Sequence, residues 1–434
     1  MGDARGDHVK VESDAPANEL EKMMNSTNLN MSPGCCIFKV PNILRRHNPR
    51  AYAPNAFSIG PYHYGEEHLQ ATQKIKLKYL HDLISGFENP KTTLRTLAGD
   101  VSEVHQEARD CYAEPIDHIS RDEFVKLMVL DGCFLIELFR RNADDALQKD
   151  DDPVFTRSCM RQLLNLDLIL VENQIPWLVL ERLFNRTRKR EEMPHLLSSL
   201  VLGYFRDAGI IIPYLPYSDP LFQQFLSRNH ENKHILDILR ESLVMSYSIS
   251  QEGNSYAGSM PSATRLREAG IKFKRGTSSK SILDIKFNKD GVLEVPPLNI
   301  QETAGSLFRN LICLEQCLPN CDPIVTSYAI LLDQLIDTRE DMEILCESGI
   351  IKNWLNVDDV TGLFNQLYLG TFLKEYYYTP LIAKVNEYCG HRWPRYRTVL
   401  MRDYFNHPWA FVSVVAAAIL LILTFLQTLF SIIK

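Results

Sequence analysis

The sequence predicts a mainly α-helical protein, with a small antiparallel β-hairpin or meander in the helical body and a C-terminal transmembrane helix. Apolar residues recur at helical spacing over most of the chain, which is typical of amphipathic helices. One short stretch alternates apolar and polar residues with period two, as strands do. Residues 410–433 contain no charged residue. The chain has 434 residues, 45% of them hydrophobic, which is enough to build a large core.

Residues 1–34 are predicted to form a disordered N-terminal tail. They include scattered Asn, Ser and Pro and almost no aromatic residues, and such a stretch buries too little apolar surface to fold alone. The apolar run of a secretory signal is missing. We therefore expect the folded body, a mainly helical domain, to occupy residues 35–390.

Two helices with strongly apolar faces are predicted in the first half of this body. Ser120 and Glu123 have the spacing of a capping box, which opens the first of them. The second runs from 160 to 184, and Pro176 is expected to kink it. The later predicted helices cover 301–317, 323–337, a short segment opened by Thr338, and 360–400.

Residues 271–297 are predicted to form the small antiparallel sheet. The segments IKFKR and SILDIKF alternate apolar and polar residues, and NKDG supplies a turn into VLEV before two prolines. Short alternating runs joined by such a turn are typical of a hairpin or meander.

The C-terminal segment has the features of a membrane anchor. A helix over 410–433 would be about 36 Å long, enough to cross a hydrocarbon core of about 30 Å. The preceding segment, 391–409, is rich in arginine and aromatic residues, as segments at the cytosolic face of a membrane are. These features predict a single-pass, tail-anchored protein of the plasma membrane, with a cytosolic body and the lipid bilayer as a partner.

The composition argues against several classes of protein. The formal net charge is −7, whereas nucleic-acid-binding domains are usually basic, so we expect no nucleic-acid partner. The ten cysteines show no paired spacing, which indicates reduced thiols. Walker, GxSxG, HExxH and CxxC motifs are all missing, so no cofactor is predicted.

Asp131 and Glu172 are the candidates for catalysis. Asp131 lies beside the apolar face of its helix in LMVLDGCFLIELF, and Glu172 lies in the apolar stretch DLILVENQIPWLVLERLF. Two buried carboxylates brought together would have raised pKa values, as general acids do. The alternative, which we favour, is structural. The carboxylates and the amides of Asn173 and Gln174 can bond backbone groups that a helix disturbed by Pro176 leaves free.

Two further groups of residues could bind a metal. Cys313 and Cys317 are four residues apart and could share a helical face as ligands of a soft metal. Buried free thiols are the simpler interpretation. His63, with His68 and Glu66 nearby, could form a metal or acid–base site. A loop that leads into a helix with an acidic first turn explains the same residues.

Six ordered motifs carry a resemblance to a known family. They are CCIFKVPNILRRHNPRAYAPNAFSIGPYHYG, LMVLDGCFLIELFR, LDLILVENQIPWLVLERLF, SATRLREAGIKFKR, GVLEVPPLNI and FRNLICLEQC…VTSYAILLDQLIDTREDMEIL. Together with the terminal apolar helix, they resemble the plant-specific domain-of-unknown-function family 247 over residues 35–434. The resemblance implies a plant source and association with a membrane. Some members have been associated with self-incompatibility in grasses, and others with development or stress. The family has no established catalytic activity, so its motif residues carry no assigned chemistry.

The leading hypothesis is a membrane-anchored, non-enzymatic recognition or signalling protein with an unknown protein partner. One alternative is a membrane-tethered hydrolase that uses Asp131 and Glu172. Another is a lipid-binding module whose Arg392–Arg402 stretch contacts anionic headgroups. An enzyme predicts a deep pocket with converging carboxylates, whereas a recognition protein predicts an exposed apolar patch instead. Because binding residues concentrate in loops, the predicted partner contacts are Asn142–Pro153, Asn185–Glu192 and Ile249–Pro261.

Overall fold

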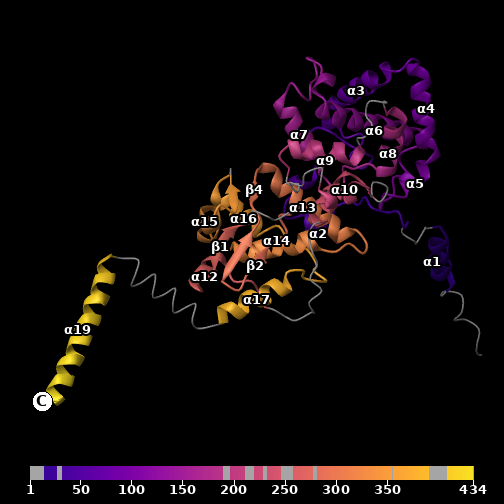
Figure 1. Cartoon of the computed structure of the whole chain (residues 1–434). Helices are drawn as coiled ribbons and strands as arrows, with labels where there is room; N and C mark the ends of the chain where they lie inside the picture. Colours follow the sequence, from indigo (N-terminus) through magenta and orange to yellow (C-terminus); the bar gives the residue numbers. More distant parts are fainter. Residues whose placement is uncertain are drawn as a thin grey trace, which may run out of the picture.

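The computed structural model describes residues 14–26, 32–188, 196–210, 219–227, 232–245, 258–276, 281–353, 355–390 and 408–433. Over these ranges the chain is mainly helical (Figure 1). The helices and 3₁₀ turns up to residue 244 are α1 (Asp14–Ser26), α2 (Asn42–Arg45), η1 (Pro49–Tyr52), η2 (Glu67–Thr72), α3 (Gln73–Ser85), α4 (Pro90–Glu103), α5 (His105–Arg109), α6 (Arg121–Ala143), η3 (Asp145–Leu147), α7 (Ser158–Leu168), α8 (Trp177–Thr187), α9 (Leu197–Asp207), α10 (Pro220–Ser227) and α11 (Ile235–Val244). The later elements are α12 (Ala263–Glu268), β1 (Lys272–Arg275), β2 (Lys286–Phe287), β3 (Val292–Val295), β4 (Leu298–Ile300), α13 (Glu302–Cys317), α14 (Ile324–Leu335), α15 (Arg339–Glu347), β5 (Ile351–Asn353), α16 (Val357–Phe364), α17 (Thr379–Gly390) and α19 (Pro408–Ile433).

Helix α6 lies at the centre of the first half of the body. It packs against α3, α4, α8 and α9, and most of its side chains are buried. The Ser120 hydroxyl accepts a hydrogen bond from the Glu123 amide at 3.2 Å, so the Ser120 half of the predicted capping box is present. The Glu123 carboxylate accepts a hydrogen bond from the Tyr64 hydroxyl at 3.1 Å.

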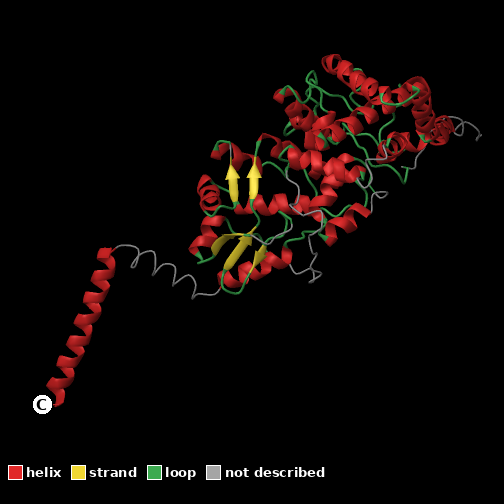
Figure 2. Cartoon of the chain, turned by 45° about the horizontal axis from the view of Figure 1, so that its top comes forward, coloured by secondary structure: helices red, strands yellow, loops and turns green. Residues whose placement is uncertain are grey.

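Helices α13 and α14 pack together in the second half of the body, with two small sheets nearby (Figure 2). They correspond to the helices predicted over 301–317 and 323–337. Thr338 opens α15, as predicted, through a complete capping box with Asp341. These helices begin and end close to where their apolar periodicity and cap residues predict.

The antiparallel sheet predicted at 271–297 is only partly correct. Strands β2 and β3 form an antiparallel hairpin across the turn at 288–291, where Gly291 has a φ of +73°. Strand β1 runs parallel to β3 along its other edge. A parallel pair requires a connection that crosses back, and the stretch between β1 and β3, which contains β2, makes it. A second sheet, which the sequence did not predict, pairs β4 in parallel with β5.

Two long predicted helices are interrupted. The helix predicted over 160–184 is divided into α7 and α8, so residues 172–174 lie in a connection rather than in a kinked helix. Pro176 immediately precedes α8, where its missing N–H removes no helical hydrogen bond. The helix predicted over 360–400 is divided into α16 and α17, with no helix over 365–378.

The N-terminal stretch predicted to be disordered, 1–34, contains the helix α1. The described side chains of α1 are exposed.

The predicted transmembrane helix at 410–433 is wrong. Among the described helices, α19 included, none is long and apolar enough to span a membrane. Three further expectations depended on this helix and are withdrawn with it. They are the tail anchor, the single-pass topology with a cytosolic body, and the plasma-membrane location. The predicted juxtamembrane segment, 391–409, lies mostly outside the described residues.

Candidate functional site

The connection between η1 and η2 has no helix or strand over 54–60 and enters the interior at 57–60. Residues 57–60 are buried, so their backbone amides cannot bond to water and need partners within the protein. Most of these partners belong to a group of side chains that also ties neighbouring segments together. Each is at most 4% exposed, and we call the group the polar cluster: Asp131, Asp167, Glu172, Asn173 and Gln174.

Asp167, in the last turn of α7, holds the beginning of this connection. Its Oδ1 accepts a hydrogen bond from the Asn55 amide at 2.6 Å. Its Oδ2 accepts from the amides of Ala56 and Phe57, at 2.8 and 2.7 Å. Burial raises the pKa of Asp167, and the amide hydrogen bonds oppose that rise. The Asp167 carboxylate thus supplies the hydrogen-bond acceptors that the backbone of a neighbouring strand would supply in a sheet.

Asn173 and Asp131 hold the end of the same connection. The Ile59 amide donates to Asn173 Oδ1 at 2.7 Å, and the Gly60 amide donates to Asp131 Oδ2 at 2.8 Å. Lys76 Nζ lies 2.5 Å from Asp131 Oδ1, and neither side chain is exposed. Burial raises the pKa of Asp131, and Lys76 opposes that rise.

Gln174 closes the break between α7 and α8. Its Nε2 donates to the carbonyl oxygens of Leu168 and Leu170, at 2.9 and 2.8 Å. Its Oε1 accepts from the Leu236 amide at 3.2 Å, which ties the connection to α11. The Gln174 side chain therefore satisfies carbonyl groups that the end of α7 leaves without helical partners.

Glu172 binds a different set of partners. Its Oε1 accepts hydrogen bonds from the Val40 amide at 2.6 Å and from Arg45 Nη2. Its Oε2 makes an ion-pair contact with His63 Nε2 at 3.2 Å. On the other side of the ring, His63 Nδ1 lies 2.7 Å from Glu66 Oε1. The carboxylate therefore joins α2 and the segment around residue 63 to the α7–α8 connection.

The charges around His63 favour the ionised forms of both partners. Burial alone would lower the pKa of His63, but its contacts with Glu172 and Glu66 raise that pKa above its ordinary value. Burial alone would raise the pKa of Glu172, but its ion-pair contact with His63 and its hydrogen bond from Arg45 lower that pKa. An imidazolium between two carboxylates is consistent with both directions.

The two candidate catalytic carboxylates have separate surroundings in the structure. Asp131 contacts Lys76 and the Gly60 amide, whereas Glu172 contacts Arg45, His63 and the Val40 amide. Among the hydrogen bonds of the described residues, the two carboxylates have no partner in common. The arrangement can hold backbone segments together, and the His63–Glu172 pair consists of groups that can act in proton transfer.

The candidate metal ligands form smaller groups. Cys313 and Cys317 lie one turn apart on α13. Their mutual hydrogen bond and burial raise the pKa of the Cys313 thiol well above its usual value. His68 Nδ1 lies 3.7 Å from Glu66 Oε2. Within the described ranges, no group of three or more His, Cys, Asp or Glu side chains could hold a metal ion.

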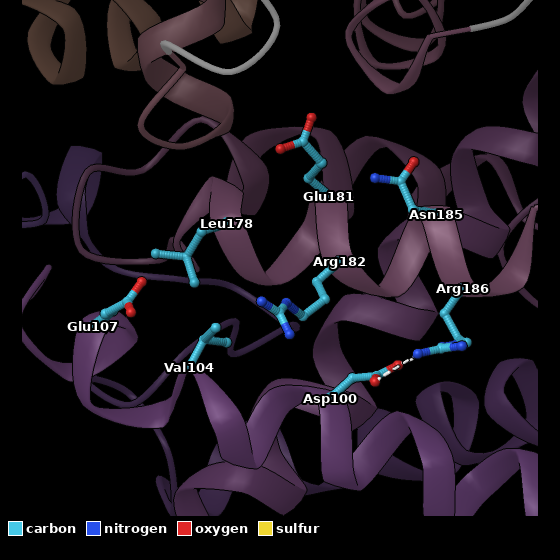
Figure 3. Close-up of a pocket in the computed structure, with 8 residues that line it drawn as sticks. All are labelled: Asp100, Val104, Glu107, Leu178, Glu181, Arg182, Asn185 and Arg186. Atoms are coloured by element: carbon cyan, nitrogen blue, oxygen red, sulfur yellow. Dashed lines mark hydrogen bonds and ion pairs between the residues drawn. The ribbon is translucent and has the colours of Figure 1, made fainter.

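An open hollow of about 560 Å³ lies over α4, α5 and α8 (Figure 3). Arg186 binds Asp100 through two hydrogen bonds of 2.6 and 2.9 Å. In Figure 3, Arg182 extends across the hollow between α8 and the helices below, while Glu181 and Asn185 point away from them. Asn185, the first residue of the predicted loop Asn185–Glu192, lines the hollow. The structure places residues 185–187 in α8 rather than in a loop, and 189–192 lie outside the described residues.

A second hollow, of about 550 Å³, lies beside the other charged loop. Asn142 and Ala143 contribute to it, together with apolar residues of α9 and α10 such as Leu200 and Leu226. Asn142 begins the predicted loop Asn142–Pro153. The structure places Asn142 and Ala143 at the end of α6, and the rest of the segment contains η3. The third predicted loop, Ile249–Pro261, lies outside the described residues except for 258–261.

Comparison with known proteins identifies the family. Residues 37–423 match the model of DUF247, described as a plant protein of unknown function. The chain belongs to this family. The sequence motifs had indicated the same family, and that assignment is confirmed. Its membrane qualifier has no support from the described helices.

Curated relatives of this DUF247 chain come from Arabidopsis thaliana. The UPF0481 protein At3g47200 is 27% identical over 420 residues, which cover 91% of this chain and 85% of the relative. The putative UPF0481 protein At3g02645 is 22% identical over 489 residues, which cover 92% and 90%. No solved structure matches the chain significantly.

The sequence analysis does not predict every residue of the site. It does not identify Lys76 or Asp167 as site residues, and it does not pair His63 with Glu172. A signal for Lys76 was available, because it shares helical spacing with the buried residues Tyr79 and Leu83 on α3. A lysine on an apolar face suggests a buried acidic partner. No comparable local signal links His63 to Glu172.

Proposed function

We propose that this DUF247 protein acts by binding a protein partner, as a non-enzymatic recognition or signalling protein. One observation mainly carries the proposal: the buried carboxylates are engaged in holding the backbone. Asp131 and Asp167 accept hydrogen bonds from backbone amides, and both are fully buried. A general acid or a nucleophile needs an oxygen that a substrate can reach.

The surface supports the same proposal. The two hollows are open, and each is lined by the first residue of one of the predicted contact loops, Asn185 or Asn142. The loop at 142–153 is acidic and the loop at 185–192 is mainly basic, so they would attract different partner surfaces. Such a protein fits the signalling roles, self-incompatibility and development among them, that the family resemblance implies for some members.

One observation favours an enzyme as the second candidate. His63 Nε2 lies 3.2 Å from Glu172 Oε2, and histidine–carboxylate pairs are common in acid–base catalysis. The hydrolase that uses Asp131 and Glu172 would need both carboxylates at one substrate. Neither hollow is lined by either of them. The recognition protein therefore remains the better-supported proposal.

Proximity labelling in plant tissue tests the proposal. The full chain would carry a biotin ligase, and chimeras would exchange loops 142–153 and 185–192 for those of a relative. We expect the labelled set of proteins to change to the relative's set, because the loops choose the partner. A matched control exchanges the exposed turn at 288–290, which lies outside both hollows, and should leave the labelled set unchanged.

A His63→Gln variant separates the two candidates. A recognition protein keeps its labelled set when this variant is folded, because the loops are intact. The proposal is contradicted if the loop chimeras keep the parent's partners while the folded His63→Gln variant loses biological activity.

A further inference from the structure

A hollow of about 390 Å³ between α10 and α11 lies outside the polar cluster. Leu221, Phe225 and Met245 give it an apolar wall, and Lys233, Asp237 and Glu241 contribute charge. An apolar wall with a few charged groups is the usual composition of a site that binds an amphipathic side chain or small molecule.

Asp237 is the unusual residue of this hollow. It is 2% exposed, yet it borders the open space. Its Oδ2 accepts a hydrogen bond from the Lys233 amide at 3.0 Å, while its Oδ1 has no hydrogen-bond partner among the described residues. A buried carboxylate oxygen without a hydrogen bond is destabilising, so a ligand that donates to it would bind favourably.

Lys233 shows which ligand chemistry fits. Its ammonium Nζ lies 3.8 Å from Asp237 Oδ1, which is an ion-pair contact but too long for a hydrogen bond. The Lys233 side chain is 43% exposed, so another cation can displace it. Glu241, one turn further along α11, already binds Arg240 Nη1 at 2.5 Å. Asp237 Oδ1 is therefore the acceptor that an incoming cation could bind once it displaces Lys233.

We propose that this hollow binds an arginine or lysine side chain presented by a protein partner. The aliphatic stem of that side chain would lie against Phe225 and Met245, as basic side chains commonly do on apolar surfaces. Its guanidinium or ammonium group would donate to Asp237 Oδ1 and displace Lys233. This inference rests on the proposed function, since it names the chemistry of one contact with the partner.

A matched pair of probes tests the site on the full chain. N-acetyl-arginine amide carries the guanidinium, and N-acetyl-citrulline amide has nearly the same shape without the charge. The methyl signal of Met245, labelled with carbon-13, reports occupation of the hollow. We expect a saturable shift with the arginine probe and none with the citrulline probe. Equal responses to both probes, or no response to either, would overturn the proposal.

Substitutions locate the contact. Asp237→Asn should abolish the response to the arginine probe, whereas Glu343→Gln, on the exposed face of α15, should not change it. Lys233→Gln should tighten binding severalfold, because the competing cation is gone. Its side chain is partly exposed, so this variant remains informative if Asp237→Asn fails to fold. Unchanged binding in Lys233→Gln would contradict the displacement.

The outcomes also separate this inference from the proposed function. If the arginine probe binds but the loop chimeras keep the parent's labelled partners, the basic-side-chain site is supported. The proposal that the loops select the partner is then contradicted. If the chimeras exchange partners but the arginine probe does not bind, the role of the loops is supported and the basic-side-chain site is contradicted.

Discussion

Asp131 and Lys76 form an ion pair in which neither side chain is exposed. Replacing Asp131 by Asn would leave the Lys76 ammonium buried without its carboxylate. Removing one partner of a buried pair typically costs about 3–5 kcal/mol. We therefore expect Asp131→Asn to lower the free energy of unfolding by that order, measured by urea denaturation.

A double-mutant cycle provides the control for Asp131→Asn. Lys76→Met alone should also destabilise the protein, but the two changes together should cost less than the sum of the single changes, because no buried charge is then left alone. Strict additivity, or an Asp131→Asn variant as stable as the parent, would contradict a structural role for the pair.

His63 gives the protein a pH-dependent contribution to stability. Its folded pKa is raised above the ordinary value of 6.5, so its contacts with Glu172 and Glu66 contribute fully below pH 6.5. The contribution is lost as the pH rises through the raised, folded pKa. Melting temperatures of the parent and of His63→Gln should therefore differ most below pH 6.5 and converge as the pH rises through the raised folded pKa.

Comparing the melting temperatures of the parent and His63→Gln isolates the contribution of His63 from those of the neighbouring charged groups. Glu66 and Glu172 both contact His63, Arg45 contacts the same Glu172 carboxylate, and the variant leaves these three groups and His68 unchanged. A difference in melting temperature that grows as the pH rises would show that the sign of this linkage is wrong.

Sequence reasoning found several residues of the polar cluster but not their partners. Asp131 and Glu172 stood out because a carboxylate within an apolar run is costly without a partner. Their partners come from Gly60 and Val40, 71 and 132 residues away along the chain. Local periodicity carries no information about such distant pairs, so the roles of the carboxylates could not be decided from it.

The break between α7 and α8 also shows that local periodicity cannot predict where distant contacts end a helix. The apolar pattern over 160–184 is continuous, so periodicity predicts one helix. The structure ends α7 at Leu168 because Gln174 and Asn173 supply side-chain hydrogen bonds that replace helical ones. Pro176 correctly predicts that the helical pattern is disturbed near residue 176. It immediately precedes a new helix, α8, instead of kinking one continuous helix.

Gly60 tests how closely this connection packs on its neighbour. It has a φ of +76°, and an added Cβ would lie 2.3 Å from the Gln174 carbonyl oxygen. Gly60→Ala should therefore combine backbone strain, about 1–3 kcal/mol for such a position, with a backbone clash. The loss of stability would be measured by urea denaturation.

Gly65 offers a matched control for Gly60→Ala. Its φ is also positive, at +90°, but an added Cβ would meet nothing within 4 Å. Gly65→Ala should show the backbone strain alone, so it should destabilise the protein less than Gly60→Ala does. Equal losses in the two variants would mean that the close approach to Gln174 is absent.

At the scale of the whole molecule, the sequence predicted the helical class, the position of α13 and α14, and the β2–β3 hairpin. These features depend on local periodicity, caps and turns, which a sequence displays directly. The parallel β1–β3 and β4–β5 pairs depend on contacts between distant segments. The buried path of residues 57–60 also depends on contacts between distant segments, and no local pattern encodes it.

Buried side chains, rather than a helix or strand, hold residues 55–60 in place, with 57–60 in the core. Their hydrogen bonds cross long stretches of chain, such as the 112 residues between Asn55 and Asp167. Backbone amides with such buried partners should exchange with solvent only when the surrounding structure opens.

Native-state hydrogen exchange of these amides, in the parent and in Asp167→Asn, tests the claim most directly. We expect the amides of Phe57, Ile59 and Gly60 to be as well protected in the parent as those of α6. In Asp167→Asn the Phe57 amide should lose protection, while Ile59 and Gly60 keep theirs through Asn173 and Asp131. Fast exchange of all three amides in the parent would contradict the account.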